Sequence, residues 1–428
     1  MANVSPDNVP FQTEEAATVT QIVTASDEGM VGRRIAFIML GLVSGFCLAT
    51  FERRRLQVRG WLGVLMLAFF CWSVMSLGWA EDTSLALRKV LIFVLLWLGA
   101  AWTASRLSAM NLLRFGFISN MLTLLTCVAI EIGFGRFRPW VGGFRFAGIY
   151  HPNETGQCLL VATVTGCALA SLSGRFVSSV GYIAAACISF AFLLLTGSRT
   201  ALLSALVALA AYWIVIACAN PRALRALLIC GAAGVFVAGL GYLLAGPDLV
   251  THAGTALQLN RADSDVSTLT NRTPLWHALI DHYISARPWL GYGYGSFWST
   301  KHIVAMSLLQ KGTVYFHSHS GYLEMALGIG IVGAAVHVLT LLLGVKGMFA
   351  EYRWTGNQAS AFGSALLITL LVSMFTEPTN MSSYLMPTFL DMAFLMRCAF
   401  IRPDDLLAGV RWAAPAAPWA GPQWAPSL

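Results

Sequence analysis

Residues 315–333 read Tyr315-Phe-His-Ser-His-Ser-Gly-Tyr-Leu-Glu-Met-Ala-Leu-Gly-Ile-Gly-Ile-Val-Gly333. The first half of this stretch is polar, and the second half opens an apolar run that continues to about residue 345. A run of about 20 apolar residues is long enough to cross a bilayer as a helix. Ser320 is a suitable N-cap for that helix, and Glu324 falls in its first turn, where a negative charge suits the helix dipole. The stretch therefore predicts a membrane-spanning helix that begins at a polar boundary.

The whole chain has the composition of a membrane protein. Of its 428 residues, 57% are hydrophobic and 11% are charged, whereas a soluble domain carries about 25% charged residues. The apolar runs lack the alternation of a transmembrane barrel, so we predict an all-α polytopic membrane protein with about 11 transmembrane helices (a range of about 10–12). The predicted spans are residues 35–51, 60–79, 89–104, 111–134, 155–173, 176–196, 200–219, 223–245, 321–345, 358–376 and 383–401.

Polar segments divide the chain into five parts. We predict a polar N-terminal tail at 1–32, an N-terminal transmembrane bundle at 33–245, a large periplasmic loop at 246–320, C-terminal transmembrane helices at 321–401 and a disordered tail at 402–428. The N-terminal tail has no apolar signal core, so we expect no cleaved targeting peptide.

Short basic connections set the predicted orientation. They contain Arg53, Arg54, Arg55 and Arg59; Arg106 and Arg114; and Arg222 and Arg225. The positive-inside rule makes these connections cytoplasmic, so 135–154, 246–320 and the 197–200 junction face outward. The N-terminus then also lies outside, which Arg33 and Arg34 oppose mildly. We attribute the net charge of +7 to this orientation rather than to nucleic acid binding. The nine cysteines lack metal-ligand spacing, so neither zinc nor disulfides are expected.

The long loop contains a predicted amphipathic helix. Thr273-Pro274 supplies an N-cap and a proline at the first helical position. One face of the helix would be apolar, and it would lie on the membrane surface. That face comprises Trp276, Leu279, Ile280, Tyr283 and Ile284. The segment Arg287-Pro-Trp-Leu290 ends the helix, and Gly291-Tyr-Gly-Tyr-Gly295 predicts a tight turn.

Arginine and histidine at the outward boundary indicate chemistry on a charged substrate. Arg199 lies in a short junction between apolar spans, where a charge is costly and is usually paired or functional. Guanidinium binds phosphate groups bidentately, and the imidazole of His319 suits proton transfer. Two plainer alternatives stay open: Arg199 could be an interfacial anchor, and His319 could merely lie at a helix cap. Asp391, the deepest acidic residue, is expected to form a structural ion pair with an arginine of the bundle.

Four motifs resemble the O-antigen ligase and O-antigen polymerase superfamily, from about Arg136 to Gly333. The motifs are His319-Ser320, then nine residues, then Gly330-x-x-Gly333; Thr196-Gly-Ser-Arg199-Thr-Ala-Leu-Leu203; Asp265 to Trp276 around Arg272, followed by Ala286 to Gly295; and Arg145, ten residues, then Gly156. The region around Arg272 is most similar to exopolysaccharide polymerases, in which glycine often precedes the arginine. Here Asn271 stands in that position.

The resemblance implies a metal-independent glycosyltransferase without a cofactor, at the outer face of the bacterial inner membrane. The donor would be an undecaprenyl-pyrophosphate-linked oligosaccharide, and the acceptor a glycan or lipid A core. Arg199 and Arg272 would bind the pyrophosphate and stabilise its departure, and His319 would act on the acceptor hydroxyl. Arg145 would help to hold the donor or the growing chain, and His317 and Arg287 are further candidates for substrate binding. Besides the lipid bilayer, the implied partners are a chain-length regulator and a flippase of the same pathway.

Three functions follow from these observations. The first is a polymerase of exopolysaccharide or O-antigen repeat units, which the Arg272 region and the Arg145 pattern favour. The second is an O-antigen ligase, which uses the same donor and transfers the glycan to lipid A core. The third is a transporter or flippase of lipid-linked sugars. A transporter would place polar groups near the midplane in repeated halves, whereas the candidates here gather at the outer face.

Overall fold

The computed structural model describes residues 31–51, 56–219, 225, 272–310, 313–378 and 386–401. Within these ranges the chain is all-helical, with no strand. The N-terminal half forms α2 (Val31–Phe51), α3 (Gly60–Met75) with the 3-10 turn η2 (Ser76–Gly78), α4 (Thr83–Arg106), α5 (Ala109–Gly133), α6 (Pro152–Leu172), α7 (Phe176–Leu195) and α8 (Arg199–Cys218). The C-terminal half forms α11 (Arg272–Leu279), the π-helical turn η3 (Ile280–Ile284), α12 (Thr300–Leu309), α13 (Gly321–Thr355), α14 (Gln358–Ser373) and α15 (Met386–Phe400).

Seven of the described helices are long and apolar enough to cross a membrane, namely α3 with η2, α4, α5, α6, α7, α8 and α13. The helices α2 and α14 contain shorter apolar stretches. The chain is therefore a multi-pass, all-α membrane protein, as predicted. The predicted span 223–245, the loop segment 246–271 and the tail 402–428 lie outside the described residues, so the total of about 11 helices stays a prediction. At the N-terminal boundary, α2 begins at Val31, slightly before the predicted end of the polar tail.

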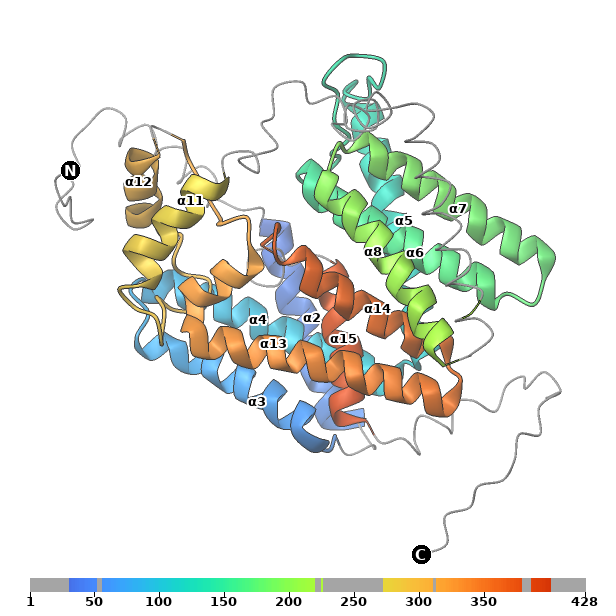
Figure 1. Ribbon diagram of the computed structural model, residues 1–428, viewed down its shortest axis with the longest axis horizontal. Helices are drawn as coiled ribbons and strands as arrows, with labels where there is room; N and C mark the ends of the chain where they lie inside the picture. The colour runs from blue at the N-terminus through green and yellow to red at the C-terminus, as the bar shows by residue number, and fades with distance from the viewer. Residues whose placement is uncertain are drawn as a thin grey trace, which may run out of the picture.

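The helices form two groups joined by α14 and α15 (Figure 1). On one side lie α5, α6, α7 and α8, and on the other lie α2, α3, α4 and α13. Between them, α14 packs on α8 and α13, while α15 packs on α4 and α5. Fully buried apolar side chains such as Leu112, Leu159, Phe362 and Phe394 belong to one continuous core. The two groups are therefore packed as a single bundle.

Two of the three predicted basic connections lie at one end of this bundle, and Arg222 of the third is outside the described residues. The backbone amide of Arg59 donates to the carbonyl of Ala399 (2.9 Å), and the Arg397 guanidinium donates to the carbonyl of Leu107 (3.0 Å). The connection before α3, the connection before α5 and the end of α15 therefore meet, as the predicted topology requires. Which face of the membrane this end occupies stays a prediction.

The helix α13 is broken at Gly330. Gly330 has a φ of 73°, outside the helical range. A Cβ atom at this position would lie 2.0 Å from the carbonyl oxygen of Trp289, so only glycine fits. The break divides α13 into a short helix, residues 321–329, and a longer helix after Gly330.

The break frees backbone carbonyls of α13, and these accept hydrogen bonds from the turn that follows η3. The carbonyls of Leu327 and Gly328 accept hydrogen bonds from the amides of Tyr292 and Gly293, both at 2.8 Å. The indole of Trp72 donates to the carbonyl of Ile329 (2.9 Å). Buried backbone carbonyls require such partners, so the break is fully integrated into the fold.

The amphipathic helix of the loop is present as α11 and the π-helical turn η3. Of its predicted apolar face, Leu279, Tyr283 and Ile284 are buried, whereas Ile280 is 44% exposed. The predicted turn at 291–295 is confirmed, since its three glycines all have positive φ.

Candidate active site

The candidate site begins in the loop that carries both histidines into α13. The amide of Ser318, which lies between them, donates to the Glu324 carboxyl group (2.5 Å), and its carbonyl accepts from the Trp276 indole (2.8 Å). His319 has a φ of 55°, the only positive φ outside glycine in the described residues. For a non-glycine residue this conformation costs on the order of 1–3 kcal/mol. The hydrogen bonds of Ser318, the residue before His319, therefore hold the loop in the shape that keeps His319 in this strained conformation.

The boundary at Ser320 differs in detail from the prediction. Ser320 occupies the N-cap position, but its side chain makes no bond to a helix amide. Its hydroxyl instead donates to the carbonyl of Met374 (3.2 Å), which also accepts from the amide of Gly321 (2.8 Å). Glu324 lies in the first turn, as predicted. The start of α13 is thus bonded to the end of α14, rather than closed by its own cap.

The two imidazoles are neighbours. The rings of His317 and His319 lie 4.1 Å apart between centroids, at an interplanar angle of 73°. Each Nδ1 atom is buried and has no hydrogen-bond partner among the described residues. Burial lowers the pKa of His317 to about 4, helped by Arg272 and His151. Burial and the neighbouring His317 lower the pKa of His319 to about 3. Both imidazoles are therefore neutral at neutral pH, with a nitrogen available to a ligand.

Arg272 approaches this pair from the start of α11 and is held by the segment after α14. Its guanidinium donates to the carbonyl of Thr376 and lies 3.5 Å from the Glu377 carboxylate. Glu377 also accepts hydrogen bonds from the Asn153 amide (3.2 Å) and from the Thr200 side chain. Burial raises the pKa of Glu377, and Arg272 opposes the shift. Glu377 thus connects Arg272 to the ends of α6 and α8.

Arg145 and Gly156, which are separated by ten residues, meet the same junction. The Arg145 guanidinium donates to the carbonyl of Thr196 and to the side chain of Asn153, both at 2.8 Å. A Cβ atom on Gly156 would lie 2.8 Å from the Cβ of Ala201 and 3.3 Å from that of Ser198. The spacing therefore reflects packing of α6 on the turn that presents Arg199.

Arg199 is the first residue of α8, and its side chain is half-buried. The preceding Ser198 caps the helix by accepting from the amide of Ala201 (3.3 Å). The following Thr200 bonds to Glu377. This places the backbone of Arg199 beside the Arg272–Glu377 pair.

Arg287 lies in a different environment. Its guanidinium lies over the ring of Tyr292, 4.9 Å from the centroid. The charges that influence His302 are those of Glu81, Lys301 and Arg287, and burial lowers the pKa of that histidine. The electrostatic neighbours of His317 and His319 include Arg272 but not Arg287. The structure thus brings His317, His319 and Arg272 together and leaves Arg287 on the neighbouring loop.

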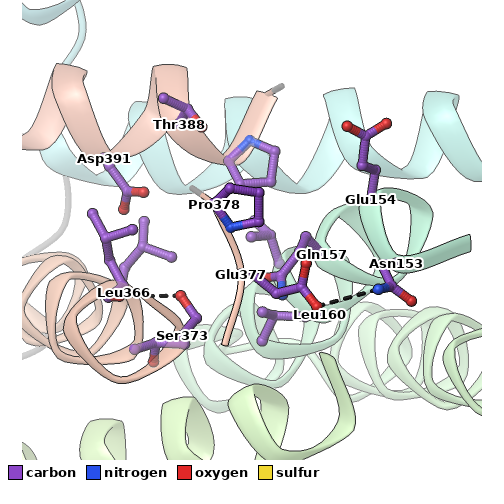
Figure 2. A pocket seen from close by; sticks show the side chains of 14 residues that line it. Asn153, Glu154, Gln157, Leu160, Leu366, Ser373, Glu377, Pro378, Thr388 and Asp391 are labelled. Carbon is purple, nitrogen blue, oxygen red and sulfur yellow. Dashed lines mark hydrogen bonds between the residues drawn. The ribbon is translucent and has the colours of Figure 1, made fainter. Parts of the chain in front are cut away.

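A small, partly open cavity of about 40 Å³ lies next to Glu377, between α6, α14 and α15. Asn153, Gln157 and Asp391 line it together with apolar side chains (Figure 2). The expected ion pair of Asp391 is absent from the described part of the chain, and its Oδ1 atom is buried without a partner. Arg397 is the arginine of the same helix, but its guanidinium donates to the carbonyl of Leu107 at the other end of α15.

Sequence reasoning missed two members of the site. Glu377 follows α14, and the sequence alone shows no partner for it. His151 precedes α6, where its ring nitrogen accepts from the amide of Asn153 (3.3 Å). His151 lies within the Arg145–Gly156 motif, and this position could have indicated that it belongs to the site. Among the described residues, no three His, Cys, Asp or Glu side chains are grouped to hold a metal ion.

Comparisons with known proteins give two matches. A family model described as O-antigen ligase matches residues 184–338. The exopolysaccharide production protein ExoQ of Rhizobium meliloti (strain 1021) is 26% identical over 337 residues, which cover 76% of this chain and 74% of that protein. The matched family region contains Arg199, Arg272 and both histidines, whereas Arg145 and Glu377 lie outside it.

Proposed function

We propose that the chain, which is similar to the O-antigen ligase family over residues 184–338, is a glycosyltransferase facing the periplasm of a bacterial inner membrane. It moves a glycan from an undecaprenyl-pyrophosphate donor to a sugar hydroxyl and so polymerises exopolysaccharide or O-antigen repeat units. The observation that carries this proposal is the meeting of His317 and His319 with Arg272, from segments separated in the chain. A base beside a phosphate-binding cation is what this transfer needs.

Arg272 binds the pyrophosphate of the donor. Its planar guanidinium can form two parallel hydrogen bonds to phosphate oxygens, and it keeps its charge at any relevant pH. Thr376 and Glu377 hold the guanidinium in place before the donor arrives. A preorganised cation stabilises the charge that develops on the leaving group. Arg199, at the adjacent start of α8, is the second such cation in the proposal.

In the transfer step, the acceptor oxygen forms a bond to the anomeric carbon of the donor sugar. The bond between that carbon and the pyrophosphate oxygen breaks, and the pyrophosphate leaves with the electron pair. The acceptor proton passes to the neutral imidazole of His319. No metal or cofactor enters this step. Arg145 holds the junction before α8 and contributes to donor binding from the α6 side.

Donor binding makes His319 a stronger base. In the free protein, burial and the charge of Arg272 keep the pKa of His319 low. A pyrophosphate on Arg272 adds negative charge beside the ring, which favours the imidazolium form. The imidazole therefore becomes able to accept a proton when the substrate is present.

Polymerisation is favoured over ligation by the exopolysaccharide relative, which matches along three quarters of this chain. The description of the family model as O-antigen ligase supports the second candidate, transfer of the glycan to lipid A core. Both reactions use the same donor chemistry, and they differ in the acceptor.

The deciding experiment supplies purified protein in liposomes with undecaprenyl-pyrophosphate-linked oligosaccharide as the sole substrate, in the presence of a chelator. We expect a ladder of longer lipid-linked products. Transfer that starts only when lipid A core is added would identify a ligase. The absence of product with either acceptor would contradict glycosyl transfer and direct attention to a flipping assay.

A further inference from the structure

Glu324 is a buried acid that binds the histidine loop instead of the substrate. Its exposure is 5%, and its carboxyl group accepts from the amide of Ser318 at 2.5 Å. The indole of Trp298 donates to both carboxyl oxygens, at 2.9 and 3.1 Å. Ser318 immediately precedes His319, so Glu324 holds the backbone directly before the strained histidine.

The short helix that carries Glu324 is fixed at both ends. At its start, the amide of Gly321 donates to the carbonyl of Met374 (2.8 Å). At its end, the break at Gly330 releases backbone carbonyls that bond to the 291–295 turn. Without the break, these carbonyls would bond within a continuous helix and would be unavailable to the turn.

We propose that Glu324 is a positioning residue for His319, and that the break at Gly330 allows residues 321–329 to dock as the separate helix that carries it. This inference rests on the proposed function, in which His319 receives the acceptor proton. The proposal accounts for the spacing between His319 and Gly330. The segment between these two residues is the short helix whose Glu324 positions the imidazole of His319.

Turnover and donor binding test the proposal together. We expect Glu324→Ala to lower kcat by about 100-fold, because small displacements of a catalytic group have effects of this size. The Kd for undecaprenyl-pyrophosphate-linked oligosaccharide should stay unchanged. Glu324→Gln keeps an oxygen for Ser318 and Trp298, and it should restore kcat to within about fivefold of the native value. Native turnover in Glu324→Ala, or no rescue by Glu324→Gln, would overturn the proposal.

A double variant separates positioning from general destabilisation. If Glu324 acts through His319, the His319→Ala/Glu324→Ala protein should have the same residual rate as His319→Ala alone. A further loss in the double variant would show an independent structural role. Ser364→Ala, which removes the hydrogen bond from the buried hydroxyl of Ser364 in α14 to the carbonyl of Val345 in α13, is the matched control and should keep native turnover.

Chemical labelling tests the geometry without relying on turnover. Diethyl pyrocarbonate modification of His319, mapped by mass spectrometry, should be faster in Glu324→Ala than in the native protein and in Ser364→Ala. Should Glu324→Ala fold poorly, Trp298→Phe removes one donor to the same carboxyl group and should give a smaller increase. Unchanged labelling in both variants would contradict the proposal. Faster labelling in a protein that forms no glycan product would support positioning and reject the proposed function.

Discussion

The side-chain amide of Asn153 donates a 3.2 Å hydrogen bond to the carboxyl group of Glu377, although 224 residues separate them. Asn153 lies in the first turn of α6 and also accepts from Arg145. Glu377 follows α14 and pairs with Arg272. A chain of polar contacts therefore connects Arg145 to Arg272, two of the three arginines that we propose to bind the donor.

Removal of Glu377 should affect both stability and transfer. In Glu377→Ala, the partly buried guanidinium of Arg272 loses its ionic partner. Breaking a fully buried pair typically costs about 3–5 kcal/mol, and we expect a smaller loss here. We expect a lower thermal midpoint in detergent and a turnover reduced by at least about tenfold. Glu377→Gln should give intermediate values, because its oxygen can still accept from Asn153. Glu351→Gln, in the last part of α13, is the control, and an effect as large there would contradict a site-specific role.

His319 and His317 should respond differently to substitution. His319→Ala should bind lipid-linked donor normally yet lower turnover by about 100–10,000-fold, the usual contribution of a general base. His317→Ala should have a smaller effect, because His317 contacts the ring of His319 but takes no proton in the proposed transfer. Measurement of donor Kd and kcat for both variants checks the order. Full activity of His319→Ala at native expression would exclude it as the base.

The local elements could be predicted because their signals are local. Apolar runs near the membrane length fix the spans, and the glycines at 291, 293 and 295 fix a turn that needs positive φ. The burial of individual side chains on the loop helix was less predictable. Ile280 is exposed whereas Tyr283 and Ile284 of the same predicted face are buried, and this difference depends on packing against other segments.

Candidate site residues could be predicted only where residue type or a motif carries a signal. His319 was proposed because an imidazole suits proton transfer, and Arg272 because its motif resembles the family; the structure places the two in one cluster. Glu377 was not, because its role comes from partners on three other segments. Asp391 shows the converse, since its depth in the bundle indicated an ion pair, whereas its Oδ1 atom is buried without a partner among the described residues.

Two arginines of the loop provide a matched comparison. Arg272→Lys keeps the charge but loses the planar fork, so we expect turnover to fall by about 10–100-fold. Arg287→Lys should change kcat by less than about threefold, because the guanidinium of Arg287 lies over Tyr292 and cation–π contacts at exposed sites are weak. Steady-state kinetics with the lipid-linked donor measure both. Equal losses would show that Arg287 also acts at the reacting pyrophosphate.

Stability should fall with acidification because of the two histidines. The folded-state pKa values of about 4 for His317 and about 3 for His319 lie below the ordinary value of 6.5. Below pH 6.5 the two histidines therefore bind protons in the unfolded chain but not in the folded chain. The free energy of unfolding decreases as the pH falls toward 4. The thermal midpoint should drop less over this range in a His317→Asn/His319→Asn protein. Equal slopes for the native and double-variant proteins would contradict buried neutral imidazoles.

The two glycines of the Gly330-x-x-Gly333 motif should differ in tolerance. A Cβ on Gly330 meets the carbonyl oxygen of Trp289 at 2.0 Å in a positive-φ conformation, so Gly330→Ala should cost on the order of 2–4 kcal/mol. A Cβ on Gly333 meets the side-chain Cδ1 of Ile329 at 2.6 Å, and a flexible side chain can move aside. Gly333→Ala should therefore keep a thermal midpoint closer to that of the native protein. Because the break at Gly330 fixes the helix that carries Glu324, Gly330→Ala should also lose turnover at temperatures where the protein remains folded. A Gly330→Ala protein with native turnover and stability would show that α13 can run unbroken without disturbing the histidine loop.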